Sequence, residues 1–158
     1  MERDEFLDKI EKFYLTPARE IMSHDFPAVK RDEPIRRVIR EISKQSVDHL
    51  WVVDSNNKVI GIITEKDLLD GIKEPLFGED IAWDTLEIRS LLYRDVKTAE
   101  DMMTSRLFKC EPDTRLKEIV KLMVDNRIRH LPVIEDGLPV GEITIDQIIK
   151  LVDKEFFD

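Results

Sequence analysis

An internal repeat constrains this chain more than any other feature of its sequence. When the second half is laid over the first at a spacing of 81 residues, Met22 meets Met103 and His49 meets His130. The second copy lacks one residue in a turn, after which the spacing is 80 and Thr64 meets Thr144. Loops tolerate such length changes, so the gap supports two copies of one unit. Further matches are Asp32 with Asp113, Leu50 with Leu131, Val52 with Val133, Gly61 with Gly141 and Ile63 with Ile143.

Each copy shows the pattern strand, helix, strand, turn, strand, helix, which predicts an α+β fold of two tandem β-α-β-β-α repeats. A chain of 158 residues is short for two independent domains, so we expect the copies to share a core. Asp32 is the expected N-cap of the first long helix. The first copy is expected to have strands at 26–30, 50–53 and 59–63, with helices from Pro34 and Thr64. The second is expected to have strands at 107–110, 131–134 and 140–143, an Asp136-Gly137 turn, and helices at 113–123 and 144–152.

Two segments lie outside the repeats. Phe6, Ile10 and Phe13 stand at helical spacing, so residues 1–17 are expected to form an amphipathic helix. Residues 71–97 are expected to form a helical connector, either a bracing helix between the copies or a dimer contact or lid. The predicted divisions are 1–17 for the N-terminal helix, 18–70 for repeat one, 71–97 for the connector and 98–158 for repeat two.

The charge balance excludes several classes of partner. A formal net charge of -9 disfavours duplex nucleic acid.

No apolar run reaches the length of a membrane span, and the acidic start does not match a signal peptide, so we expect a cytoplasmic protein. Cys110 is the single cysteine of the sequence and so cannot form an internal disulfide. We expect it to be a small buried apolar residue. The three histidines and one cysteine show no zinc-ligand spacing, so we expect no metal site.

The chain resembles a tandem pair of cystathionine beta-synthase (CBS) domains, the Bateman module. Three strings carry this resemblance: Asp101-Met102-Met103-Thr104, then 126–134 followed by Asp136-Gly137, and Gly61-Ile62-Ile63-Thr64-Glu65-Lys66-Asp67. The resemblance implies that the two repeats pack sheet against sheet around a pseudo-two-fold axis. It also implies clefts that hold AMP, ADP, ATP or S-adenosylmethionine, and pairing of chains into a homodimer.

The string from Gly61 to Asp67 is implied to bind ribose through Thr64 and Asp67, with Thr144 as the counterpart in repeat two. A carboxylate that accepts bonds from two vicinal hydroxyls makes a strong charge-assisted contact, and Gly61 would let the backbone pass close to the ligand. The same spacing also fits a capping box in both copies. The sequence therefore leaves ribose binding and helix capping open, and Thr64 can serve both.

Repeat two departs from this pattern because Gln147 stands where the ribose carboxylate is expected. Gln147 offers no charged hydrogen bond, and Asp146 points about 100° away around an ideal helix. We therefore expect unequal sites, with the one at Asp67 the tighter.

Phosphate groups in an acidic protein need local positive charge. Arg129 and His130 occupy the place where the family carries basic residues, and His49 is the counterpart in the first copy. Lys66 and Arg106 are weaker candidates. The alternative for either histidine is a structural role: each stands just before a buried strand, where its ring could be half-buried and hydrogen-bonded to the backbone. The adenine slot is assigned by position alone to Pro27, Ala28, Val29 and Phe108.

The leading hypothesis is a regulatory module that senses an adenosine nucleotide and modulates a separate, unknown partner. The alternative is a ligand-free structural or protein-interaction module with the same fold. An enzyme is disfavoured because phosphate-loop glycines, a metal triad and an activated nucleophile are all missing from the sequence. No catalytic cofactor is expected.

Overall fold

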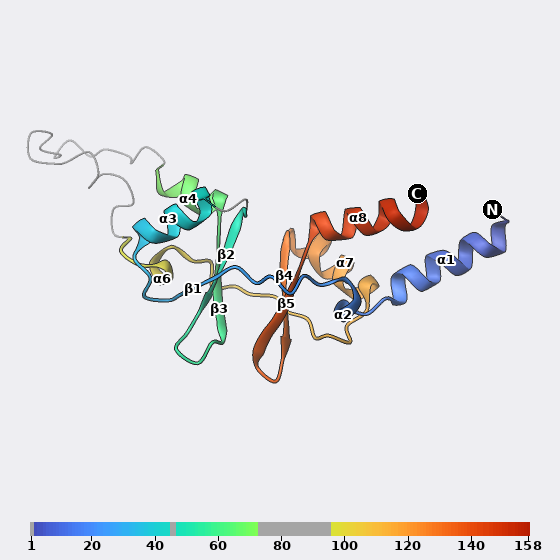
Figure 1. Cartoon of the computed structure of the whole chain (residues 1–158), viewed down its shortest axis with the longest axis horizontal. Helices are drawn as coiled ribbons and strands as arrows, with labels where there is room; N and C mark the ends of the chain where they lie inside the picture. Colours follow the sequence, from blue (N-terminus) through green and yellow to red (C-terminus); the bar gives the residue numbers. More distant parts are fainter. Residues whose placement is uncertain (1, 45–46, 73–95) are drawn as a thin grey trace, which may run out of the picture. The chain divides into compact units, whose positions relative to one another are not determined.

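The computed structural model describes residues 2–44, 47–72 and 96–158, which fall into two compact units. The repeat-one unit holds residues 27–107. The repeat-two unit holds residues 1–26 and 108–158. Each contains a β-hairpin accompanied by helices (Figure 1).

The repeat-one unit is built on a three-stranded sheet in the order β1-β2-β3. Strand β1 runs parallel to β2, and β2 pairs antiparallel with β3. A parallel pair needs a crossover, which α3 supplies between β1 and β2. The elements are β1 (Ala28–Lys30), α3 (Ile35–Lys44), β2 (His49–Val53), β3 (Val59–Thr64), α4 (Glu65–Gly71) and α6 (Ala99–Met102).

The repeat-two unit follows the same plan around the antiparallel pair of β4 and β5. The hairpin turns at Asp136 and Gly137, whose φ angles of 53° and 80° suit the tight turn predicted from their sequence. A single parallel bridge from Cys110 to Val133 stands where the sequence predicted a strand over 107–110. The elements are α1 (Arg3–Leu15), α2 (Ala18–Ile21), α7 (Leu116–Asn126), β4 (His130–Glu135), β5 (Leu138–Thr144) and α8 (Ile145–Phe156).

Each unit has its own small apolar core at matching sequence positions, which differs from the shared core that the chain length predicts. Alternate residues of each hairpin contribute to it, because successive strand residues point to opposite faces of a sheet. Leu50, Val52 and Ile63 are buried in the repeat-one unit, as are Leu131, Val133 and Ile143 in the repeat-two unit. The repeat seen in the sequence is therefore also a repeat of the core.

The first residues of each repeat pack against the hairpin of the other copy. Ser23 pairs with Glu142 of β5, and Thr104 pairs with Ile62 of β3. The short helices α2 and α6 precede these pairs and place Ala18 and Ala99 in the two cores. The compact units therefore divide the chain near residues 26 and 107, whereas the sequence repeat divides it before residues 18 and 98.

The prediction that Asp32 caps the first long helix is wrong. Helix α3 begins at Ile35, and Asp32 lies in the turn before it. The Ile35 N–H donates to the Lys97 carbonyl at 3.0 Å. The equivalent N–H of α7, from Leu116, donates to the Thr16 carbonyl at 2.8 Å. In each unit a backbone carbonyl from a segment distant in the sequence therefore accepts from the first N–H of the helix.

The N-terminal segment forms α1, whose aromatic side chains pack on α8. Phe6 and Phe13 meet the Phe156 ring edge-on, with centroid separations of 6.2 and 5.2 Å. Nearly all of the predicted helical connector over 71–97 lies outside the described residues. Within the described part of the chain, no helix has the length and apolar character that crossing a membrane requires.

Candidate functional site

The predicted ribose residues lie where β3 ends and α4 begins. Thr64 is the N-cap of α4: its hydroxyl accepts from the Asp67 backbone N–H at 3.3 Å. The Asp67 Oδ2 atom accepts from the Thr64 backbone N–H at 2.8 Å and from its hydroxyl at 3.0 Å. The capping interpretation of this spacing is therefore confirmed, and one carboxylate oxygen of Asp67 is committed to it.

The second oxygen of Asp67 has a different neighbour. Its Oδ1 atom accepts a hydrogen bond from the Thr104 hydroxyl at 3.3 Å. Asp67 is half-buried and Thr104 is exposed, so this oxygen stands near solvent. Thr104 is not among the site residues predicted from the sequence. The 81-residue spacing is the signal that points to it, because Thr104 matches Ser23 and both side chains carry a hydroxyl.

The equivalent position in repeat two has the same cap with different chemistry. The Thr144 hydroxyl accepts from the Gln147 backbone N–H at 3.4 Å, and Gln147 Oε1 accepts from the Thr144 N–H at 3.2 Å. Asp146 is exposed in the first turn of α8. Repeat two therefore has an amide, and repeat one a carboxylate, at the same point of the fold.

Close contacts within the protein explain why glycine stands at residues 61 and 141, where the two motifs begin. A Cβ atom on Gly61 would overlap the side chain of Met103. A Cβ atom on Gly141 would lie 2.6 Å from the backbone oxygen of Ser23 and 2.9 Å from Met22 Sδ. The close approach that we expected between Gly61 and a ligand is thus made by Met103 in this structure.

Two of the predicted phosphate contacts lie in the repeat-one unit, in contrasting environments. Lys66 is exposed in the first turn of α4, next to the capping residue. His49 is only 3% exposed. Its Nδ1 atom lies 2.8 Å from an Asp48 carboxylate oxygen, and its ring stands edge-on to Trp51 at 5.8 Å. Lys66 is therefore accessible to an anion, whereas His49 is packed inside the protein.

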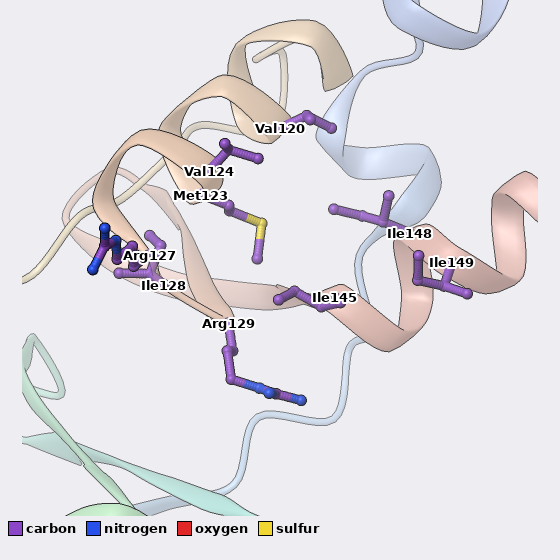
Figure 2. A pocket seen from close by; sticks show the side chains of 9 residues that line it. All are labelled: Val120, Met123, Val124, Arg127, Ile128, Arg129, Ile145, Ile148 and Ile149. Carbon is purple, nitrogen blue, oxygen red and sulfur yellow. The ribbon is translucent and has the colours of Figure 1, made fainter.

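The other two phosphate candidates lie at the start of β4. His130 is half-buried and stands opposite Thr144 in the hairpin register. The Arg129 carbonyl accepts from the Ile145 N–H at 3.1 Å, which ties this residue to the start of α8. Its exposed side chain lines the hollow drawn in Figure 2.

That hollow lies between α7 and α8 and has a volume of about 460 Å³. Val124 and Ile149 flank it with exposed fractions of 69% and 60%. Figure 2 shows apolar side chains from both helices around the opening, with Arg127 and Arg129 toward one end. The lining is otherwise apolar and comprises Val120, Met123, Val124, Ile128, Ile145, Ile148 and Ile149.

The four residues assigned to the adenine slot are divided between the units. Pro27 is half-buried, Ala28 is exposed, and Val29 packs against the repeat-one core. Phe108 packs against the repeat-two core. No single unit holds all four, so within a unit they do not form a slot.

Cys110 is buried in the repeat-two core. Burial raises the pKa of its thiol to about 12, and the nearby charge of Glu111 adds to this shift. A thiol that stays protonated is a poor nucleophile. The residue therefore acts as a small apolar side chain.

Several known proteins resemble this chain in sequence. An uncharacterized protein of Methanocaldococcus jannaschii, MJ1225, is 26% identical over 89% of this chain and 44% of its own length. A homoserine O-acetyltransferase of Methanobrevibacter ruminantium is 30% identical over 84% of this chain and 23% of its own length. The mitochondrial CBS domain-containing protein CBSX3 of Arabidopsis thaliana is 29% identical over 78% and 55%. The chain thus matches only part of each of these relatives.

Solved structures share the fold. The CBS domain of a membrane protein from Sphaerobacter thermophilus has a TM-score of 0.73 and 25% identity, covering 94% of this chain and 95% of that one. CBSX2 in complex with AMP has a TM-score of 0.70 and 22% identity, covering 87% and 97%. The CBS domain pair of protein MJ0100, in complex with 5′-methylthioadenosine and S-adenosyl-L-methionine, has a TM-score of 0.69 and 22% identity, covering 89% and 98%.

The family model of the CBS domain matches this chain twice, at residues 18–74 and 99–154. These two matches coincide with the internal repeat and cover most of the sequence. The chain therefore belongs to the CBS domain family, as a tandem pair.

Proposed function

We propose that this chain is a regulatory module that binds an adenosine nucleotide, and that Asp67 holds the ribose. The observation that carries this proposal is the uneven use of the Asp67 carboxylate. Oδ2 accepts two bonds, at 2.8 and 3.0 Å, whereas Oδ1 accepts one, at 3.3 Å. A carboxylate has about four lone-pair sites, so Oδ1 retains capacity for a sugar hydroxyl.

The structures of other CBS proteins support an adenosine ligand. CBSX2 was solved with AMP, and the MJ0100 pair with 5′-methylthioadenosine and S-adenosyl-L-methionine. We extend this ligand class to the present chain as AMP, ADP, ATP or S-adenosylmethionine. Thr64 and Asp67 then bind ribose, with Thr144 as the weaker counterpart. Lys66, Arg129, His130 and His49 remain the proposed phosphate contacts, and Pro27, Ala28, Val29 and Phe108 the proposed adenine contacts.

Calorimetric titration with AMP, ADP, ATP and S-adenosylmethionine tests the ribose assignment. Asp67→Asn keeps an oxygen acceptor for the cap but removes the charge, so affinity is expected to fall about tenfold or more. Asp70→Asn is the matched control, because Asp70 is an exposed carboxylate of the same helix. Equal affinity in wild type and Asp67→Asn contradicts the assignment.

The second candidate function is a ligand-free interaction module. The capping boxes favour it, because Asp67 and Gln147 both have a role in stability that requires no ligand. Thermal unfolding separates the two candidates. A nucleotide that binds only the folded state at a hundred times its Kd stabilises it by about 2.7 kcal/mol. The ligand-free module predicts an unchanged melting temperature at millimolar nucleotide.

We further propose that two chains pair as a homodimer and modulate a separate partner without catalysing a reaction. Val124 and Ile149 leave a large apolar surface beside the hollow between α7 and α8. Leu69, which matches Ile149 at the 80-residue spacing, is also 65% exposed. A second copy offers apolar surface of the same kind, so both chains would cover theirs by pairing.

Analytical ultracentrifugation tests this assembly. A dimer is expected for wild type and for Lys150→Asp, which changes an exposed charge next to the patch. Ile149→Asp is expected to give monomers, because a carboxylate would be buried in the interface. A monomeric wild type, or a dimer that survives Ile149→Asp, rules out this surface as the interface.

A further inference from the structure

Residues 97–104, around the start of repeat two, belong to the compact repeat-one unit and contact the proposed ribose residue Asp67. Their backbone is bonded to the rest of that unit at several points. The Lys97 carbonyl accepts from the Ile35 N–H at 3.0 Å, and the Ala99 N–H donates to the Glu33 carbonyl at 2.8 Å. An ion pair between Arg31 and Glu100 joins the same surfaces.

Thr104 is the last residue of this segment and makes two backbone hydrogen bonds with Ile62 of β3. Its N–H donates to the Ile62 carbonyl at 2.8 Å, and its carbonyl accepts from the Ile62 N–H at 3.0 Å. A β-branched side chain has few rotamers, so a fixed backbone also restricts the hydroxyl. That hydroxyl donates to Asp67 Oδ1, the oxygen that we assign to the ribose.

We propose that Thr104 is a positioning residue for nucleotide binding: it orients the Asp67 carboxylate so that the remaining lone pair of Oδ1 faces a sugar hydroxyl. This inference rests on the proposed function of Asp67. Thr64 holds one oxygen from the N-cap position of α4, and Thr104 holds the other from a segment 37 residues away in the sequence. A carboxylate fixed at both oxygens loses less rotational freedom when ligand binds.

The matching position in repeat two provides an internal comparison. Ser23 pairs with Glu142 through the same two backbone bonds, at 2.9 and 3.0 Å. Its hydroxyl, however, accepts from the Asp25 N–H at 3.2 Å, and the described contacts include no bond from it to Gln147. The bridge from the preceding segment to the motif residue is therefore seen in repeat one alone among the described contacts.

Titration of the full chain with AMP tests this role. Thr104→Val removes the hydroxyl with little change in shape and is expected to weaken AMP binding about tenfold. Thr104→Ser keeps the hydroxyl and should restore most of the affinity. Ser23→Ala is the matched control and should bind AMP like wild type. The preference for AMP over 2′-deoxy-AMP should shrink in Thr104→Val, because a misoriented carboxylate discriminates less between sugars.

Two results would overturn the proposal. One is wild-type affinity in Thr104→Val. The other is equal weakening in Thr104→Val and Thr104→Ser, which would point to the shape of the side chain rather than its hydrogen bond.

A double-mutant cycle without ligand separates this proposal from the function of Asp67. Urea midpoints are measured for Thr104→Val, Asp67→Asn and the double variant, and non-additive shifts are expected from the shared hydrogen bond. Coupling without AMP binding by wild type would refute the proposed function while leaving the contact intact. AMP binding with additive midpoints would refute the role of Thr104 alone.

Discussion

The contact between Gly61 and Met103 gives the sharpest test of the packing described above. In Gly61→Ala the new methyl group overlaps the Met103 side chain, with its Cγ 2.7 Å and its Cβ 2.9 Å away. Overpacking of this kind destabilises by about 1–3 kcal/mol. Replacing glycine also stabilises by about 0.4–1 kcal/mol through the unfolded chain. The expected net loss is about 1–2 kcal/mol in the free energy of unfolding.

Removing the neighbour should remove most of this penalty. Met103→Ala alone is expected to lose about 2 kcal/mol, at the low end for such truncations, because Met103 is half-buried. In the double variant the Sδ and Cγ atoms are gone and only the Cβ of residue 103, at 2.9 Å, stays close, so a small shift lets the methyl group at residue 61 occupy the space that they leave. The two changes should therefore couple favourably by about 1–2 kcal/mol.

The corresponding pair in repeat two behaves differently, because a backbone atom is the closest neighbour. The Ser23 oxygen lies 2.6 Å from a Cβ at residue 141 and accepts from the Glu142 N–H at 3.0 Å. Met22→Ala leaves that oxygen in place. Gly141→Ala should thus be as damaging in the Met22→Ala background as in wild type, with a coupling below about 0.5 kcal/mol.

Urea unfolding followed by circular dichroism measures all the free energies that both cycles need. The reasoning predicts a clear coupling at residues 61 and 103 and nearly none at residues 141 and 22. Equal couplings in the two cycles would show that backbone and side-chain neighbours do not differ as argued. A stabilised Gly61→Ala would show that the contact with Met103 is absent in solution.

The remaining predictions concern the caps, the thiol and the second site. Thr64→Ala and Thr144→Ala should each lose about 1 kcal/mol in urea unfolding, and Thr64→Ser should lose much less; equal losses in all three would argue against hydroxyl capping. Because burial raises the Cys110 thiol pKa to about 12 from a reference value of 9.0, the unfolded chain deprotonates first, so stability should fall by about 1.4 kcal/mol per pH unit above about pH 9. Cys110→Val introduces the residue found at the matching position 29, and its stability should not show this fall above about pH 9. Gln147→Asp should raise the number of high-affinity AMP sites from one to two per chain in calorimetry, and an unchanged number would mean that the carboxylate is not what the weaker site lacks.

Much of the fold could be predicted because the same pattern occurs in both copies, so each element predicted in one copy is supported by its counterpart in the other. Hairpin strands at 50–53 and 131–134 were expected from matched apolar runs, and the structure confirms both as parts of β2 and β4. Helix starts at Thr64 and Thr144 were expected from their side chains, which do cap α4 and α8. These features depend on local sequence, which a periodic pattern reports well.

The errors arose where distant segments decide the local structure. Asp32 was expected to cap α3, but the Lys97 carbonyl takes the first helical donor. Thr104 was missed because its contact with Asp67 depends on the pairing of its segment with β3, which no local pattern encodes. The glycine at residue 61 was recognised, but the neighbour that requires it was not.

The two capping boxes differ in the hydrogen-bonding capacity that they leave at residues 67 and 147. The cap requires an acceptor for one backbone N–H, and the Gln147 amide oxygen meets that need at 3.2 Å much as the Asp67 carboxylate does at 2.8 Å. The fold therefore accepts either residue and does not require a charge. The carboxylate at residue 67 provides a second acceptor oxygen and a negative charge beyond what the cap uses. Because the cap uses only one carboxylate oxygen, and Thr104 donates one hydrogen bond to the other, the remaining lone pair supports our proposal that Asp67 accepts from a sugar hydroxyl.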